Sequence, residues 1–183
     1  MIKTKNGKIP AAVSFLARSG TGKTTLIEKI IKILSQKGYK VSSIKHTDHN
    51  VSADTEGKDS WRHKNAGAFS TMLISKEKIS FFSDIEPSAD ISIDRLISDF
   101  FTGSDIVIIE GFKELGVKKI ELARKDAGGL ELRFKNDTGL ILVCADEPII
   151  GLNVPQININ DAEKISAFIE KEIILPNSNI MSV

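Results

Sequence analysis

Glycine, lysine and hydroxyl side chains follow one another between Ala17 and Thr24 at the spacing of a phosphate-binding loop. The residues read Ala-Arg-Ser-Gly-Thr-Gly-Lys-Thr, and Thr25 comes directly after them. Backbone N–H groups of such a loop point inward at phosphate oxygens, and the following helix adds the positive end of its dipole. Lys23 can reach the β- and γ-phosphates, and the Thr24 hydroxyl can bind Mg²⁺. We therefore expect a nucleoside triphosphate to be bound by Ser19, Gly20, Thr21, Gly22, Lys23, Thr24 and Thr25.

The sequence on either side supplies the strand and the helix that this loop requires. The apolar run 11–16 precedes it, and apolar residues recur at helical spacing after it, from Leu26 to Leu34. Ala17 stands where the motif often has glycine. The alternative is a glycine-rich turn that only joins a strand to a helix, but the elements on both sides favour the phosphate-binding interpretation.

A second stretch with catalytic potential runs from Asp105 to Gly111. Four apolar residues lie between two acids, and a glycine follows, as in a central strand of Walker B type. Glu110 ends this strand, where a carboxylate can hold Mg²⁺ or orient a water molecule. We expect catalytic roles for Lys23 and Glu110 and metal binding by Thr24 and Glu110. Asp105 lies at the opposite end and is not expected to bind the metal; the alternative for Glu110 is a plain solvent-facing acid.

A charged segment around the single tryptophan is a further candidate site. Residues 59–66 are expected to form a short helix, in which Arg62 could make bidentate contacts with an anion. The alternative is that Trp61 packs inward while the charged residues are solvated. The three histidines, His46, His49 and His63, lie close together in the sequence. Hydrogen bonding to phosphate or to a partner's ligand, and a plain surface role, both remain open for them.

Strands that alternate with helices predict an α/β fold of the P-loop NTPase type. We expect a mostly parallel sheet flanked by helices on both faces, with a small β-hairpin extension formed by residues 69–74 and 78–83. Residues 118–124 alternate loosely and suggest an edge strand. Asn160 is expected to cap the last helix, with Glu163 as its capping-box partner. One nucleotide-binding domain is predicted over residues 1–175, followed by a frayed tail over 176–183.

Composition limits the classes of protein to which the chain can belong. With 183 residues, 41% hydrophobic and 27% charged, it has the make-up of a soluble globular protein. A net charge of +1 argues against a nucleic-acid partner. No apolar run approaches the roughly 20 residues that span a bilayer, so we expect no membrane partner. The N-terminus lacks a secretory signal, and the single Cys144 lies in an apolar run, so we expect a buried thiol in a cytoplasmic protein.

Four blocks of residues resemble the MobB family, whose members assist molybdopterin guanine dinucleotide synthesis. They are the loop with its helix (19–29), Ile44-Lys45-His46, the segment 57–63 followed by Ala-Gly-Ala, and Glu110-Gly111-Phe112-Lys113. The Lys-Asp-Ser-Trp-Arg-His block carries the most specific part of the match. The similarity runs from the phosphate-binding loop to about residue 120.

The resemblance implies a GTP-binding P-loop protein with weak hydrolysis that uses GTP and Mg²⁺. It also implies a homodimer that works beside the molybdenum cofactor guanylyltransferase and molybdopterin, with Arg62 and His63 as residues that recognise one of them. Guanine-specific P-loop proteins often read the base with Asn-Lys-x-Asp after a late strand, and here only Asp146 of that motif is present. We expect Asp146 to bind guanine; the alternative is that it only starts a turn.

Two other functions compete with this one. A small-molecule kinase would use the same loop, with Glu110 as base and Arg124 and Arg133 in a lid that excludes water. A non-catalytic adapter would bind nucleotide only to fix its shape.

Overall fold

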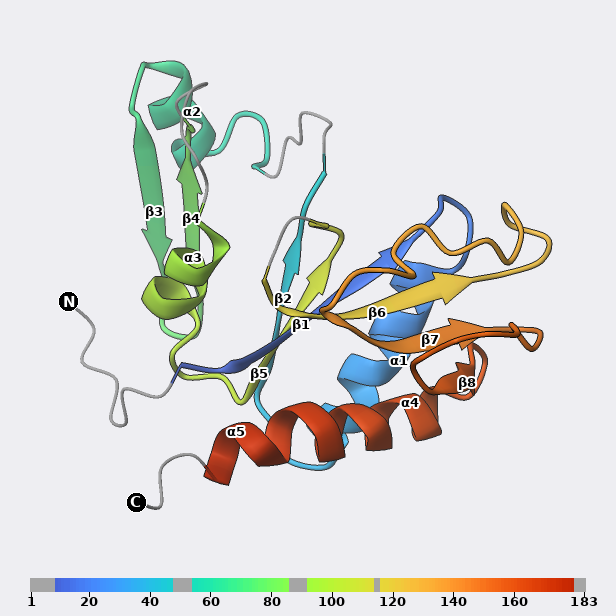
Figure 1. The fold of residues 1–183 in the computed structure, drawn as a ribbon. Helices are drawn as coiled ribbons and strands as arrows, with labels where there is room; N and C mark the ends of the chain where they lie inside the picture. Colours follow the sequence, from blue (N-terminus) through green and yellow to red (C-terminus); the bar gives the residue numbers. More distant parts are fainter. Residues whose placement is uncertain (1–8, 48–53, 86–91, 114–115, 180–183) are drawn as a thin grey trace. The chain divides into compact units, whose positions relative to one another are not determined.

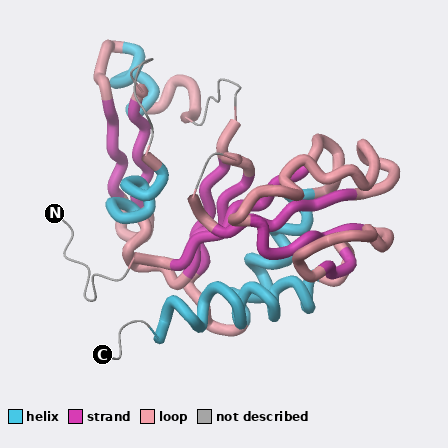
Figure 2. Tube along the Cα trace, viewed as in Figure 1, coloured by secondary structure: helices cyan, strands magenta, loops and turns pink. Residues whose placement is uncertain are grey.

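The computed structural model describes residues 9–47, 54–85, 92–113 and 116–179 (Figures 1 and 2). Contacts divide the chain into two compact units: Met1–His46 with Ile93–Val183, and Thr47–Ser92. The predicted single domain over residues 1–175 stays a prediction. Among the helices of the described residues, none is long and apolar enough to cross a lipid bilayer.

Apolar runs in the larger unit form a parallel sheet of six strands. The strands are β1 (Ala11–Ala17), β2 (Val41–Lys45), β5 (Ile106–Glu110), β6 (Lys118–Ala123), β7 (Leu140–Ala145) and β8 (Gln156–Asn158). The sheet order is β2-β5-β1-β6-β7-β8, and every pairing in it is parallel. Ile106–Ile109 of β5 are fully buried, as expected for a strand covered on both faces.

Helices cover both faces of this sheet, as the sequence predicted. Ile106 and Ile108 pack with α1 (Lys23–Gln36) and α4 (Ala162–Ile169), whereas Val107 and Ile109 pack with α3 (Ile93–Phe100). Successive side chains of β5 therefore contribute to two different cores. Figure 1 shows α1 and α4 together on one side of the sheet. The Cys144 thiol lies in the first core, and burial raises its pKa to about 12.

The smaller unit consists of one helix and the predicted hairpin. The elements are α2 (Asp59–Asn65), β3 (Ser70–Ile74) and β4 (Ile79–Ser83), and the two strands pair antiparallel. Lys64 holds the helix to the hairpin, because its Nζ donates to the carbonyls of Ala68 and Phe69 at 2.7 and 2.8 Å. The same ammonium group contacts Asp84 at 2.7 Å.

The prediction of an edge strand over 118–124 is wrong, because β6 lies between β1 and β7. Its loose alternation suggested an edge strand, yet Lys119 and Glu121 are only 5% and 3% exposed. Lys119 donates to Asp137 at 2.6 Å, and Glu121 accepts the N–H groups of Arg133 and Phe134 at 2.7 and 3.1 Å. Burial of a charged group is tolerated where such partners are present.

The prediction that Asn160 caps the last helix is also wrong. Asp161 is the N-cap, and its side chain accepts the N–H of Lys164 at 3.0 Å. From α4 the helix continues through a π-helical turn (Glu170–Ile174) into α5 (Leu175–Asn179). The helical backbone thus extends past residue 176, where the frayed tail was predicted to start. The end of that tail, 180–183, lies outside the described residues.

Candidate phosphate-binding site

The glycine-bearing loop joins β1 to α1 in a conformation that depends on two glycines. Gly20 and Gly22 have φ angles of 79° and 88°, in the left-handed region that a Cβ disfavours. Thr21 is 1% exposed, and its hydroxyl and N–H both donate to the carbonyl of Arg18, at 2.7 and 3.4 Å. The Gly22 carbonyl accepts from Leu26 at 3.0 Å, as in the first turn of a helix. The loop is therefore closed by its own backbone.

Lys23, Thr24 and Glu110 converge at the carboxyl end of the sheet. Oε1 of Glu110 accepts a hydrogen bond of 2.7 Å from Lys23 Nζ and another of 2.7 Å from the Thr24 hydroxyl. Lys45, at the end of β2, lies 3.8 Å from the same oxygen. The parallel register explains the meeting, because Glu110 pairs with Phe15 of β1 and with Lys45 of β2.

The surroundings of Glu110 keep its carboxylate ionised. Burial alone would raise its pKa, but hydrogen bonds from Lys23 and Thr24 and the charges of Lys23 and Lys45 outweigh burial and lower the pKa below 4.5. A carboxylate beside a hydroxyl offers the hard oxygen ligands that Mg²⁺ prefers. The residues present therefore fit a Mg²⁺ ion bound by Thr24 and Glu110, with Lys23 released to a phosphate.

The turn after Glu110 is fixed by contacts to two other strands. Gly111 and Phe112 have φ angles of 87° and 68°. The Ser14 hydroxyl donates to the Gly111 carbonyl at 2.6 Å, and the His46 N–H donates to the Glu110 carbonyl at 3.0 Å. The His46 ring meets the Phe112 ring edge-on, with centroids 4.5 Å apart. This contact gives His46 a packing role next to the site.

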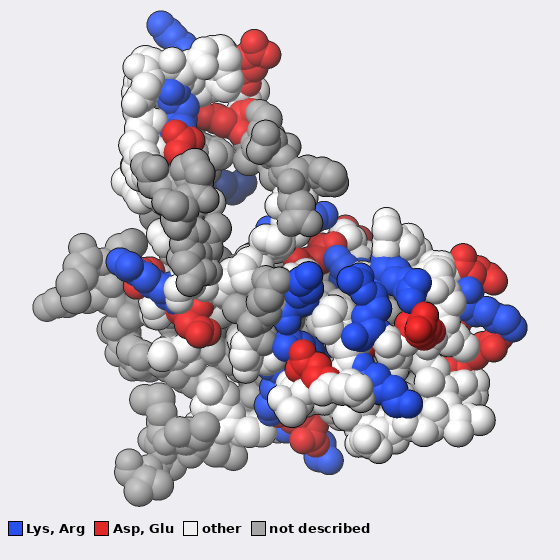
Figure 3. All heavy atoms as spheres, turned by 45° about the horizontal axis from the view of Figure 1, so that its top comes forward, with Lys and Arg blue, Asp and Glu red and all other residues white. Residues whose placement is uncertain are grey.

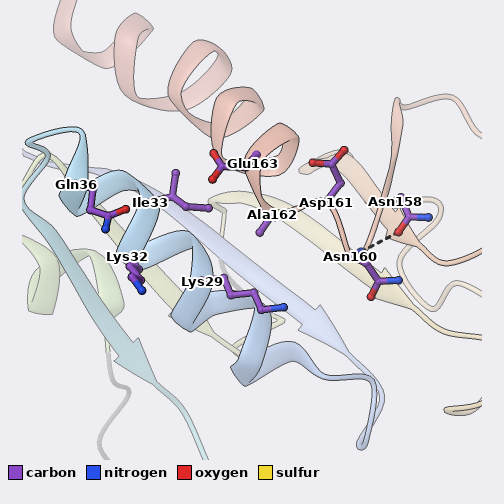
Figure 4. Close-up of a pocket in the computed structure, with 9 residues that line it drawn as sticks. All are labelled: Lys29, Lys32, Ile33, Gln36, Asn158, Asn160, Asp161, Ala162 and Glu163. Carbon is purple, nitrogen blue, oxygen red and sulfur yellow. Dashed lines mark hydrogen bonds between the residues drawn. The ribbon is translucent and has the colours of Figure 1, made fainter.

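A small cavity of about 270 Å³ opens beside the loop. Arg124 follows β6 there and bridges two walls: its Nε donates to the Thr21 carbonyl at 3.3 Å, and one terminal nitrogen donates to Asn160 Oδ1 at 3.0 Å. A larger cavity of about 730 Å³ adjoins it and shares Lys29 and Asn160 (Figure 4). The small cavity is lined by Gly20, Thr21, Gly22, Thr25, Leu26, Lys29, Arg124, Ile159 and Asn160.

Of the other predicted site residues, Asp146 belongs to the larger unit, and Arg62 and His63 belong to the smaller one. Both Asp146 oxygens accept the N–H of Lys125, at 3.1 and 3.3 Å, and Asp146 lines neither cavity. Arg62 and His63 lie on α2 in the smaller unit and are exposed. His49 lies outside the described residues. Asp105 lies at the other end of β5 and accepts the N–H of Lys40 at 2.7 Å.

Sequence reasoning missed Lys45, Lys29 and Asn160, and it gave Arg124 only a role in a lid. Three of these residues end or follow strands, so the rule that ligands bind at the carboxyl ends of parallel strands could have found them. On the face of the molecule in Figure 3, lysine and arginine side chains gather, and acidic side chains lie among them.

Comparisons with known proteins identify relatives over most of the chain. The family described as molybdopterin guanine dinucleotide synthesis protein B, MobB, matches residues 12–146. The molybdopterin-guanine dinucleotide biosynthesis adapter protein of Escherichia coli (strain K12) is 35% identical over 158 residues, which cover 86% of this chain and 90% of that protein. The protein of the same name from Haemophilus influenzae is also 35% identical, and the match covers 90% of each chain.

Solved structures confirm the fold. A crystal structure of molybdopterin-guanine biosynthesis protein B superposes with a TM-score of 0.68 at 24% identity, and covers 88% of this chain and 97% of its own. Bacillus subtilis MobB gives a TM-score of 0.68 at 22% identity, with 89% and 98% covered. The predicted α/β fold of P-loop type is therefore confirmed. From the extent of the family match and the identity to these relatives, we conclude that the chain belongs to the MobB family.

Proposed function

We propose that this protein is a GTP-binding accessory protein in the biosynthesis of molybdopterin guanine dinucleotide, with weak GTPase activity. Membership of the MobB family supports the pathway. The observation that carries nucleotide binding is the convergence of Lys23 and Thr24 on Glu110, next to a loop closed around left-handed glycines. The cofactors in this proposal are GTP and Mg²⁺.

Each part of the site has a distinct task in this proposal. Backbone N–H groups from Ser19 to Thr25 cradle the phosphates, and Lys23 neutralises the β- and γ-phosphates. Mg²⁺ held by Thr24 and Glu110 would draw charge from the γ-phosphate, and Glu110 would also orient water. The described side chains that contact Glu110 belong to Lys23, Thr24 and Lys45. None of these three is an arginine finger or a water-orienting glutamine. Because such groups contribute factors of roughly 10³ to 10⁵ to the rate, we expect slow hydrolysis.

The proposed partners are the molybdenum cofactor guanylyltransferase and molybdopterin, in the cytoplasm. Helix α2 presents Arg62 and His63 to solvent, and the Arg62 guanidinium contacts only its helix neighbour Asp59, at 3.7 Å, among the ion pairs of the described residues. Such a weak exposed pair leaves the guanidinium available for an anionic group. A phosphate of the cofactor or a carboxylate of the transferase suits it.

Replacing Lys23 tests nucleotide binding directly. Lys23→Ala removes the cation that contacts the phosphates, so we expect the Kd for GTP to rise at least a hundredfold, roughly 2.7 kcal/mol. Isothermal titration measures this change, and circular dichroism checks that the protein is folded. Lys40→Ala is the control, because Lys40 precedes β2 and lies beside Asp105, at the amino end of the strands and away from the loop. Undiminished affinity in Lys23→Ala would reject the phosphate-binding loop.

Replacing Glu110 separates chemistry from binding. In Glu110→Gln the amide binds Mg²⁺ poorly, so we expect the release of phosphate from γ-labelled GTP to fall at least tenfold, while metal-free GTP affinity changes far less. Asp105→Asn makes the same change at the other end of β5 and serves as the control. Equal turnover in Glu110→Gln and wild type would make Glu110 a plain solvated acid. Label transferred to a small molecule would favour a kinase instead.

The hairpin carries an apolar face that supports the proposed homodimer. Met72 pairs with Phe81 and Ile74 with Ile79, so these four side chains share one face. They are between 45% and 73% exposed. A two-stranded sheet is marginal on its own, and an apolar patch of this kind marks an interaction surface. A second copy of the chain would cover it.

Placing a charge on that face should break the dimer. We expect Phe81→Lys to shift the protein from dimer to monomer in sedimentation velocity, since a buried unpaired ammonium group is costly. Ser80→Lys puts the same charge on the opposite face of β4 and should stay dimeric. If Phe81→Lys sediments as wild type does, this face is not the dimer interface.

Substitutions on α2 test the partner. Arg62→Ala and His63→Ala should bind GTP with wild-type affinity. Their stimulation of dinucleotide formation by the guanylyltransferase should be at least tenfold smaller than that of wild type. Lys58→Ala, at the exposed start of the same helix, is the control. Normal stimulation by both variants would remove this helix from the partner site.

A further inference from the structure

We propose that the base of the bound nucleotide lies in the small cavity beside the loop, and that Asn160 recognises it by donating a hydrogen bond to O6 of guanine. The inference rests on the proposed nucleotide binding and adds the residue that distinguishes guanine from adenine. It also replaces Asp146, the base-binding residue predicted from the sequence, by a residue that the sequence assigned to a helix cap.

The residues on the two sides of the loop indicate the orientation of the bound nucleotide. The groups that suit the γ-phosphate and the metal, Lys23, Thr24 and Glu110, meet on one flank. The small cavity lies on the other flank, because Arg124 in its lining follows β6, and β1 separates β6 from β5 in the sheet. A triphosphate that places its γ-phosphate near Glu110 must continue past Thr25 toward this cavity. The nucleoside therefore belongs there.

The space suits a nucleoside. The small cavity of about 270 Å³ and the cavity of about 730 Å³ are neighbours, because Lys29 and Asn160 line both. Small-molecule sites in proteins usually measure roughly 300–1,000 Å³. Figure 4 shows Lys29 extending from α1 toward the segment after β8 that carries Asn160. A purine base between these two side chains would be close enough to the loop for the phosphates of the same nucleotide to be bound there.

Arg124 fixes which way the Asn160 amide faces. A guanidinium group only donates hydrogen bonds, so it must face the amide oxygen. The bond of 3.0 Å from Arg124 to Asn160 Oδ1 therefore leaves Nδ2 as the group that Asn160 offers to a ligand. Arg124 is itself held by the Thr21 carbonyl, and the Asn160 N–H donates to Asn158 Oδ1 at 2.9 Å. Asn160 is exposed and so accessible to the ligand.

A fixed donor at this position selects a keto base. Guanine and hypoxanthine carry the acceptor O6, whereas adenine carries an amino group at the same position. Two donors would face each other in the adenine complex, and one of them would lose its hydrogen bond. We expect this mismatch to lower the affinity for adenine nucleotides roughly tenfold or more.

The affinity for inosine triphosphate distinguishes between Asn160 and Asp146 as the residue that recognises the base. A carboxylate would bind N1–H and the 2-amino group of guanine, and inosine lacks the 2-amino group. A donor to O6 does not sense that group. With Mg²⁺ present, we expect wild-type protein to bind GTP and ITP with Kd values within about threefold and ATP at least about tenfold more weakly.

The variant Asn160→Asp should lose the preference for GTP over ATP. It keeps an acceptor for Arg124 but replaces the donor by a second acceptor, so the ratio of the Kd for ATP to that for GTP should fall at least about tenfold. The ratio cancels the general effect of an added negative charge. Asn153→Asp makes the same change on an exposed residue of the segment between β7 and β8 that lines neither cavity, and should keep the wild-type ratio.

The results distinguish this inference from the proposal on which it rests. Equal affinity of wild type for GTP and ATP, or ITP binding at least tenfold weaker than GTP, overturns the assignment of Asn160 and leaves nucleotide binding standing. An unchanged ratio in a folded Asn160→Asp protein overturns it too. If wild type binds no triphosphate, the proposed function fails and the inference with it. If Asn160→Asp does not fold, the wild-type series with three nucleotides still decides.

Discussion

One carboxylate oxygen of Glu110, bound by both Lys23 and Thr24, is the contact on which the candidate site depends. It requires β1 and β5 to end, and α1 to begin, at the same place. The parallel register between β1 and β5 provides this, and both strands hold it because their side chains are buried in cores on the two faces of the sheet. The packing of the sheet thus determines the distance between the groups that would bind a metal and a phosphate.

The parts of the fold that the sequence predicted are those that depend on local requirements. Two left-handed glycines, a lysine at the helix start and an acid that ends an apolar strand each have a physical reason within a few residues. The prediction that β6 is an edge strand was wrong, because its burial has no such local reason. Lys119 and Glu121 have partners between residues 133 and 137, so their burial could not be read from the strand itself. A polar residue that finds a distant partner looks like a surface residue in the sequence.

Asp146 and Asn160 show the same dependence on distant contacts in the proposed site. The position after a late strand suggested Asp146 as a base-binding residue, and this stays a prediction; its oxygens accept the Lys125 N–H, and it lines neither cavity. Asn160 looked like a helix cap because it precedes the last helix, yet the next residue is the cap. The contact that orients the Asn160 amide comes from Arg124, which follows β6. Spacing along the chain cannot reveal such a contact.

In the proposed site, Arg124 also connects the side assigned to the base with the side assigned to the phosphates. It donates to the Thr21 carbonyl, and Thr21 in turn closes the loop by donating twice to the Arg18 carbonyl. A base that orders Asn160 would therefore steady Arg124 and, through it, the carbonyl of Thr21 in the middle of the loop. Groups that share one hydrogen-bond network contribute non-additively to affinity. In the proposed complex, one arginine would thus couple the base of the nucleotide to its phosphates, so selectivity for the base would not be confined to the contacts that the base itself makes.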